Sequence, residues 1–175
     1  MEQNRRRLYS GRVITLDVAD VTLPNGHVAS LEMVGHPGGA AIVALNARGE
    51  VCLLHQYRHV AGGWLWEIPA GKLDGKTPDA TARAELAEEA GVAARTWQSL
   101  GKVVSSPGVF AEVVHLYLAQ ELTPVRAAPE REEVFEVTWV SLAEAVGRAL
   151  SGDIVDGKSV IGLLRAADQL GALGK

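Results

Sequence analysis

The sequence has little cysteine, no long hydrophobic run and no excess of positive charge. Cys52 is the only cysteine, so neither an internal disulfide nor a metal site of several thiolates can form. The longest apolar runs, such as 40–45 and 51–54, have the length of β-strands and fall far short of the about 20 residues that cross a bilayer. Acidic residues outnumber basic ones by 21 to 17, which gives no general attraction to a polyphosphate backbone. These absences predict a cytoplasmic protein with no membrane span and no nucleic-acid partner.

What the sequence does contain indicates one mixed domain with a small N-terminal appendage. The turn residues Leu23-Pro24-Asn25-Gly26 separate two alternating stretches and predict an antiparallel β-hairpin in region 1–36. Region 37–175 is expected to form the main domain, of class α+β. Its expected strands are 40–45, 51–57, 64–68, 96–104, 113–119 and 134–140, and its expected later helices are 142–150 and 158–170.

The clearest helix is predicted over Pro78 to Ala90. Thr77 is a suitable N-cap, Pro78 suits the first helical position, and Gly91 suits the C-terminal stop. On this helix Glu85, Glu88 and Glu89 are spaced i, i+3 and i+4, which places three carboxylates on one side. Such a cluster is either a solvated helix face or a cation site, since the charges repel one another without a cation.

The surrounding residues favour the cation site. The segment Gly71-Lys72-Leu73, together with 82–92, resembles the Nudix box, G-x5-E-x7-R-E-U-x-E-E-x-G-U with U aliphatic. The resemblance implies Glu85, Glu89 and the carbonyl of Ala70 as ligands of Mg²⁺, or alternatively Mn²⁺, with Glu88 supporting or sharing the site. Hard Mg²⁺ prefers such oxygen ligands. The resemblance also implies a Nudix α/β/α sandwich with a mixed sheet.

Two departures from the Nudix pattern affect the same helix and the loop before it. The spacing from Gly71 to Glu85 is one residue short, so Thr77 stands where the pattern expects a glutamate. The arginine expected before Glu85 is Ala84, and Arg83 points roughly 100° away around a helix. Turnover is therefore less firmly indicated than metal binding.

Residues outside the box resemble one branch of the family. His55-Gln56-Tyr57-Arg58, Glu67-Ile68-Pro69-Ala70-Gly71 and Ser106-Pro107-Gly108 resemble segments of the Nudix hydrolases that act on ADP-ribose and nucleotide sugars. Pro107 lies 15 residues beyond Val92, where this branch carries a proline. Asp156-Gly157-Lys158-Ser159 opens a C-terminal helix as in these proteins.

Four residues are candidates for binding the substrate. Arg58 is expected to bind phosphate, because a guanidinium donates paired hydrogen bonds to phosphate oxygens. Glu67 and Glu112 are interpreted as pocket carboxylates or as strand-edge salt bridges, and Gly108 as part of a substrate loop.

The base-stacking residue and the group that activates water are less sharply indicated. Trp64 and Trp66 are expected to face opposite ways, with at most one toward a ligand. In this Nudix branch a loop glutamate handles the attacking water, which implies the group Glu130, Glu132 and Glu133, with Glu133 preferred and Glu132 next; a solvated loop is the alternative.

The resulting hypothesis is a homodimeric enzyme that hydrolyses the diphosphate of a nucleoside diphosphate sugar. Residues 13–33 are expected to contribute to the dimer interface or to the partner's substrate pocket. ADP-ribose is the first choice of substrate. The alternatives are a GDP-sugar, NADH or a flavin dinucleotide. A further alternative is a catalytically weak Nudix-like protein that binds nucleotides in a regulatory role.

Overall fold

The computed structural model describes residues 1–129 and 131–173, which fall into two compact units. The N-terminal unit comprises Met1–Gly38 with Val104–Val113, and the main unit comprises Gly39–Val103 with the described part of the chain from Val114 on. In chain order the elements are β1 (Glu2–Ser10), β2 (Thr15–Thr22), β3 (Val28–Gly35), β4 (Gly39–Ala44), β5 (Glu50–Arg58), the 3-10 helix η1 (His59–Ala61), β6 (Gly63–Glu67), β7 (Ala70–Lys72), α1 (Pro78–Ala90), β8 (Val92–Ser106), β9 (Phe110–Pro124), β10 (Phe135–Ser141), α2 (Leu142–Ser151) and α3 (Gly157–Gln169).

The N-terminal unit contains the predicted hairpin and one strand more. Strands β2 and β3 pair antiparallel around the turn at Leu23, whose amide donates to the carbonyl of His27. The unexpected β1 pairs with β2, although its sequence lacks hydrophobic alternation. Arg5 and Arg7 of β1 instead bind the buried carboxylate of Asp17 on β2. Ion pairs rather than apolar burial therefore tie β1 to the hairpin.

The tip of the β8–β9 hairpin belongs to the same unit. The Val34 amide on β3 donates to the carbonyl of Val109 at 2.8 Å, and Val34 pairs with Phe110 in parallel register. His36 lies 5.2 Å from the Phe110 ring, centroid to centroid, and its Nδ1 is 3.4 Å from the Glu112 carboxylate. These contacts connect the hairpin tip to β3.

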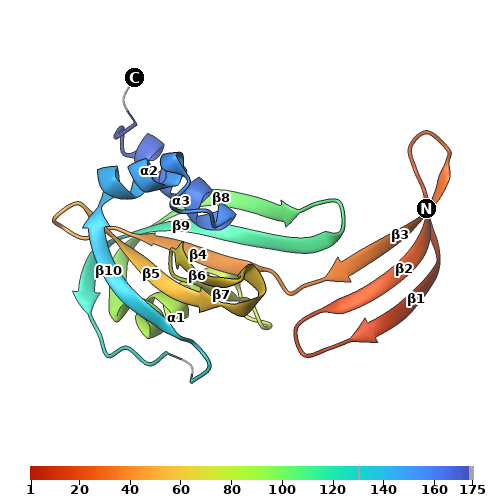
Figure 1. Ribbon diagram of the computed structural model, residues 1–175, viewed down its shortest axis with the longest axis horizontal. Helices are drawn as coiled ribbons and strands as arrows, with labels where there is room; N and C mark the ends of the chain where they lie inside the picture. Colours follow the sequence, from red (N-terminus) through yellow and green to blue (C-terminus); the bar gives the residue numbers. More distant parts are fainter. Residues whose placement is uncertain (130, 174–175) are drawn as a thin grey trace. The chain divides into compact units, whose positions relative to one another are not determined.

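The main unit is an α/β/α sandwich (Figure 1). Strand β4 is buried along its whole length and runs parallel to β9 and antiparallel to β7. A second, antiparallel sheet has the order β10-β5-β6. Helix α1 lies on one side of the strands, and α2 and α3 lie on the other (Figure 1). The Nudix-like sandwich expected from the sequence is confirmed.

The core has two parts because β-strand side chains alternate between faces. On β4, Val43 faces the cluster under α3, which includes Leu163, whereas Ile42 faces the cluster under α1, which includes Leu86. The strand is therefore apolar on both faces, as burial between two layers requires. Strand β5 follows the same alternation, with Leu53 in the first cluster and neighbouring side chains in the second.

Helix α1 has the predicted bounds and the predicted caps. The Thr77 hydroxyl accepts a hydrogen bond from the amide of Ala80 at 3.3 Å, and Gly91 ends the helix with φ of 64°. Its Leu86 is buried in the core, which fixes the side of the helix that meets the sheet. None of the helices in the described ranges is long and apolar enough to cross a bilayer.

Candidate active site

The site is centred where the buried Glu89 of α1 meets the start of β7. One carboxylate oxygen of Glu89, Oε2, accepts a hydrogen bond from the Ala70 amide at 2.8 Å. The other oxygen, Oε1, is buried and has no hydrogen-bond partner in the described part of the chain. A buried carboxylate oxygen without a partner is costly, because it has lost water and gained nothing in exchange. It is therefore a candidate cation ligand.

Glu85 lies one turn earlier on α1, against the next residue of β7. A Cβ placed on Gly71 would overlap the carboxylate of Glu85, so that only glycine leaves room for this side chain. Ala70 and Gly71 thus contact Glu89 and Glu85 respectively, one through its amide and the other through its lack of a side chain. The tight loop brings both carboxylates to one short stretch of backbone.

The electrostatics of Glu89 show how crowded the site is with negative charge. Burial is the largest cause that raises the pKa of Glu89, which reaches about 8. The Ala70 amide and the positive charge of Arg58 oppose the shift, whereas the charges of Glu85 and Glu133 add to it. A divalent cation between these groups would offset the cost of desolvation and relieve the repulsion.

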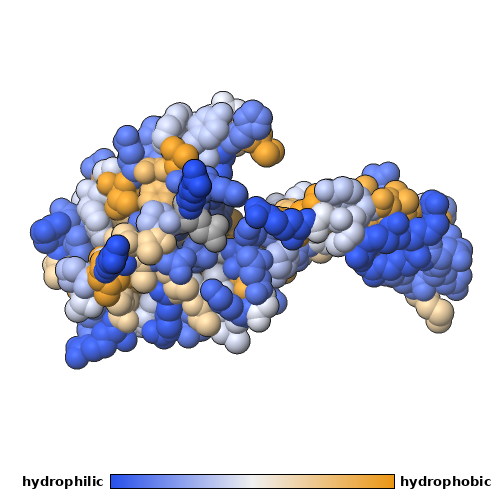
Figure 2. All heavy atoms as spheres, turned by 90° about the horizontal axis from the view of Figure 1, so that it is seen from below, coloured by the Kyte–Doolittle hydropathy of each residue, from blue (hydrophilic) through white to orange (hydrophobic). Residues whose placement is uncertain are grey.

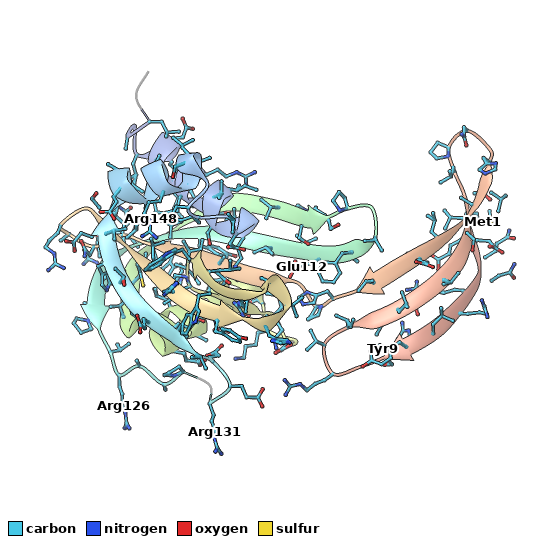
Figure 3. The ribbon with its side chains drawn as sticks, viewed as in Figure 1. Met1, Tyr9, Glu112, Arg126, Arg131 and Arg148 are labelled. Carbon is cyan, nitrogen blue, oxygen red and sulfur yellow. The ribbon has the colours of Figure 1, made fainter. Side chains whose placement is uncertain are left out.

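The acidic loop contributes Glu133 to this neighbourhood. Glu133 is half-buried and acts electrostatically on Glu89, whereas Glu132 is exposed. Glu130 lies outside the described residues. Arg131, which stands between the glutamates in sequence, is exposed and projects away from the fold (Figure 3). The structure therefore brings the preferred loop glutamate to the helix carboxylates.

Arg58 and Glu67 form an ion pair beside the same carboxylate. The Nε and Nη2 atoms of Arg58 donate to the two oxygens of Glu67 at 2.8 and 2.9 Å. Lys158 donates to Glu67 as well, at 2.6 Å. Of the two interpretations open for Glu67, the salt bridge is the one observed. Lys158 was not among the candidate residues predicted from the sequence, although it stands in the Asp156-Gly157-Lys158-Ser159 segment that carries part of the family resemblance.

Two candidate residues belong to the N-terminal unit. Gly108 lies in the turn between β8 and β9, and Glu112 faces His36, as described above. Figure 3 labels Glu112 on β9. For Glu112 the salt-bridge interpretation is again the one that the contacts describe. Their roles in substrate binding stay predictions.

The remaining candidate on α1 is Glu88, and the contacts of Arg83 on the same helix show whether it can replace the missing arginine of the Nudix pattern. Glu88 is half-buried, and its carbonyl accepts a hydrogen bond from the Ala128 amide at 3.2 Å. Arg83 pairs with Asp79 at 2.9 Å and lies over the Trp97 ring at 4.7 Å. Arg83 is therefore committed to the outer surface of α1 and does not replace the arginine missing at position 84.

The expectation for the two tryptophans is wrong. Trp64 and Trp66 are two residues apart on β6 and therefore share one face of the strand. His55 on β5 packs against both rings, at 5.0 and 4.5 Å between centroids, and Arg148 covers Trp66 from α2 at 4.2 Å. Trp66 is partly buried against the core, whereas Trp64 is about half exposed.

The donor set fits a hard divalent cation that also binds a phosphate. In the described ranges, no group of three or more His, Cys, Asp or Glu side chains converges as a metal site. Glu85, Glu89 and the carbonyl of Ala70 would therefore hold only part of the coordination shell. Mg²⁺ is commonly bound in this way, through one or two carboxylates with substrate phosphates and water filling the rest.

Comparisons with known proteins agree with this fold. A solved structure described as an ADP compounds hydrolase has a TM-score of 0.84 and 21% identity, covering 99% of this chain and 95% of that one. The family model of the NUDIX domain matches residues 35–160. The chain belongs to the Nudix family, whose members generally use divalent metal ions.

Two curated relatives are similar over most of their length. An ADP-ribose pyrophosphatase of Mycobacterium tuberculosis is 40% identical over 161 residues, which are 90% of this chain and 78% of that protein. An ADP-ribose pyrophosphatase of Bacillus subtilis is 37% identical over 158 residues, or 89% and 85% of the two chains. The family resemblance found in the sequence is confirmed.

The raised pKa of Glu89 predicts how the stability of the metal-free protein depends on pH. The folded protein holds this proton more tightly than the unfolded chain, so the free energy of unfolding falls as pH rises from about 4.5 to about 8. Glu89→Gln should remove a slope that amounts to several kcal/mol over this range, on the order of 1.4 kcal/mol per pH unit. Urea unfolding in EDTA at a series of pH values measures it. An unchanged slope in Glu89→Gln would contradict the assignment.

Proposed function

We propose that this protein hydrolyses the diphosphate linkage of a nucleoside diphosphate sugar with the help of Mg²⁺. ADP-ribose is the proposed preferred substrate. The observation that carries the proposal is the Oε1 atom of Glu89, which is buried beside Glu85 and has no hydrogen-bond partner in residues 1–129 and 131–173. A protein that did not bind a cation would gain nothing from keeping these two charges together in a desolvated place. Mn²⁺ is the alternative metal.

The residues around this pair have complementary tasks in the proposed reaction. Glu85, Glu89 and the Ala70 carbonyl would hold the metal, which when bound neutralises diphosphate charge and stabilises the attacking and leaving oxygens. Arg58 binds the phosphates through the donors that Glu67 leaves free, and this fixes the diphosphate relative to α1. Glu88, on the same helix, would support the metal site or share in it.

Glu133 is the proposed general base. Carboxylates that bind the metal have their lone pairs and charge engaged, so a separate carboxylate is needed to accept the proton of water. Water attacks phosphorus, its proton passes to Glu133, and the bridging phosphorus–oxygen bond breaks. The products are a nucleoside monophosphate and a sugar phosphate. Glu132 is the second candidate, because the same loop carries it.

The choice of ADP-ribose rests on the relatives rather than on contacts to a base. Both curated relatives described above are named ADP-ribose pyrophosphatase, at 37–40% identity and over most of their length. A GDP-sugar, NADH and a flavin dinucleotide are the alternatives within the same chemistry. The cytoplasmic location and the absence of a nucleic-acid partner stay predictions from the composition.

One observation favours a second candidate, a nucleotide-binding protein with weak turnover. Ala84 replaces the arginine of the Nudix pattern, and Arg83 is bound to Asp79 instead. The turnover number of the unmodified protein decides between the two, because a binding protein would retain the metal and the nucleotide but release no product.

Loss of a metal ligand should abolish most turnover and leave the fold intact. Glu85→Gln and Glu89→Gln each remove one charge, and kcat/KM for ADP-ribose should fall by about two orders of magnitude or more. Product chromatography over ADP-ribose, GDP-sugars, NADH and flavin dinucleotide, with Mg²⁺ and with Mn²⁺, gives the rates and the substrate preference.

Asp79→Asn is the matched control for these variants, because Asp79 lies on the same helix and pairs only with Arg83 among the described contacts. Its activity should equal that of the parent protein. Normal Mg²⁺-dependent rates in both glutamate variants would sink the metal assignment.

Loss of the general base should lower kcat and leave metal binding in place. Glu133→Gln is expected to reduce kcat by about 10²- to 10⁴-fold, and Glu132→Gln much less. Both are measured at saturating substrate and metal, singly and together, with pH profiles. Glu136→Gln on the exposed side of β10 is the control. If the double variant keeps the parent kcat and pH profile, the base is another carboxylate, with Glu112 the next to test.

The N-terminal unit supplies the proposed dimer contact. Strand β1 is exposed along its length and forms the edge of its sheet. Leu8, Tyr9 and Val28 are each more than half exposed, and Figure 2 shows a strip of hydrophobic residues in this unit beside a hydrophilic surface. Figure 3 labels Tyr9 on β1. An exposed edge strand with apolar side chains favours pairing with another chain.

We expect a homodimer in which residues 13–33 and the neighbouring β1 take part, since closed two-fold dimers are the commonest assemblies. Light scattering at micromolar concentration should give twice the chain mass of 18.6 kDa. Leu8→Asp should shift the mass toward the monomer, whereas Leu150→Asp, at an exposed position of α2, should not. A monomeric mass for the parent protein contradicts the prediction.

A further inference from the structure

A row of four alternating charges connects the start of α3 with Arg58. Arg58 binds Glu67 through two hydrogen bonds, and Lys158 donates to the same carboxylate at 2.6 Å. Lys158 also donates to Asp156 at 2.9 Å. The order is therefore Arg58, Glu67, Lys158, Asp156, with the signs plus, minus, plus, minus. All four residues belong to the main unit.

Glu67 is the buried centre of this row. Its side chain is 3% exposed, against 42% for Arg58 and 18% for Lys158. Burial alone would raise the pKa of Glu67, but Arg58 and Lys158 outweigh it and lower the pKa to about 2. Glu67 thus stays ionised, with two cations sharing its charge. Lys158 therefore supplies part of the positive charge that compensates for the burial of Glu67.

The far end of the row is fixed to backbone. Asp156 caps α3 by accepting from the Ser159 amide at 3.1 Å, and it also accepts from the Ser159 hydroxyl. The oxygen of this buried hydroxyl accepts in turn from the amide of Ile68 at 2.8 Å. Ile68 follows Glu67 directly, so the network closes on the strand where it began. Lys158 is therefore held between two carboxylates whose positions are set.

The row leaves part of the Arg58 guanidinium uncommitted. An arginine has five N–H donors, and Glu67 takes one from Nε and one from Nη2. The Nη1 group, on the side of the fork away from that pairing, makes no hydrogen bond that involves the described residues. A guanidinium held along one edge presents its other edge in a fixed direction, which is what bidentate recognition of a phosphate requires.

We propose that Lys158, anchored by Asp156, is a positioning residue for substrate binding: it shares the charge of Glu67 and so holds Arg58 in the orientation that receives a phosphate. The inference rests on the proposed function, because it takes Arg58 as the phosphate ligand. Lys158 itself touches neither substrate nor metal. Its effect passes through Glu67 to Arg58.

A double-mutant cycle tests this connection. Lys158→Met should lower kcat/KM for ADP-ribose by about tenfold, mainly through KM, because phosphate binding by Arg58 is weakened. In an Arg58→Ala background the same change should have almost no further effect. Lys158→Arg should restore much of the loss, and Lys102→Met, at an exposed position of β8, is the control. Independent, multiplicative losses from Lys158→Met and Arg58→Ala would overturn the proposal.

A second measurement needs no substrate turnover. The Nε–H signal of Arg58 in a ¹⁵N spectrum reports its hydrogen bond to Glu67, and Lys158→Met should shift it and change its exchange with water. An unchanged signal overturns the proposal. If the parent protein hydrolyses no diphosphate, the proposed function fails, and the Arg58 signal alone then decides whether Lys158 positions it.

Asp156→Asn gives the same test with the charge of Lys158 kept in place. The substitution weakens the contact that holds Lys158 at Asp156, and Glu67 keeps both of its cations. The variant therefore replaces Lys158→Met in the test if Lys158→Met does not fold. A smaller shift of the Arg58 signal in the same direction is expected. No shift in a folded Asp156→Asn variant contradicts the part of the proposal that assigns the anchor to Asp156.

Discussion

The hydrogen bond between the Ala70 amide and the buried Glu89 carboxylate is the contact on which the site depends. It fixes the C-terminal half of α1 against β7, and the second oxygen of Glu89 is buried with no hydrogen-bond partner among the residues that the structure describes. Leu86 holds the same helix from its core side. A helix that is anchored by an apolar side chain on one face can therefore keep a costly ionisable group on the neighbouring face.

The short stretch from Glu67 to Gly71 contacts the Arg58 ion pair, helix α3 and the carboxylates of α1. Glu67 receives Arg58 and Lys158, Ile68 is tied to Ser159 on α3, Ala70 binds Glu89, and Gly71 makes room for Glu85. Helices on opposite sides of the strands thus both reach this one segment. A continuous set of contacts therefore runs from α3 to a carboxylate on α1 through this segment, in which Glu67, Ile68 and Pro69 are buried.

The altered Nudix loop takes its meaning from these contacts. The loop is one residue short and lacks the expected glutamate, and the helix lacks the expected arginine. Nevertheless Thr77 caps α1 and the glutamates keep their contacts with β7. The departures fall at the beginning and on the outer side of the helix, and the packing that positions Glu85 and Glu89 comes from Leu86, Ala70 and Gly71. The departures therefore leave intact the contacts that position Glu85 and Glu89.

The sequence by itself determined the local features: the helix from Pro78 to Ala90, its carboxylate spacing and the hairpin turn, because caps, turn residues and helical periodicity act between near neighbours. It did not reveal β1, whose pairing rests on arginines that meet Asp17 across the sheet. Nor did it show that Glu67 would be shared by Arg58 and by Lys158, which lies 91 residues further along the chain. The burial that raises the pKa of Glu89, and the approach of Glu133 to it, also depend on segments far apart in sequence. Only the tertiary structure decides these ion pairs and this burial, because desolvation and charge pairing are set by distance in space.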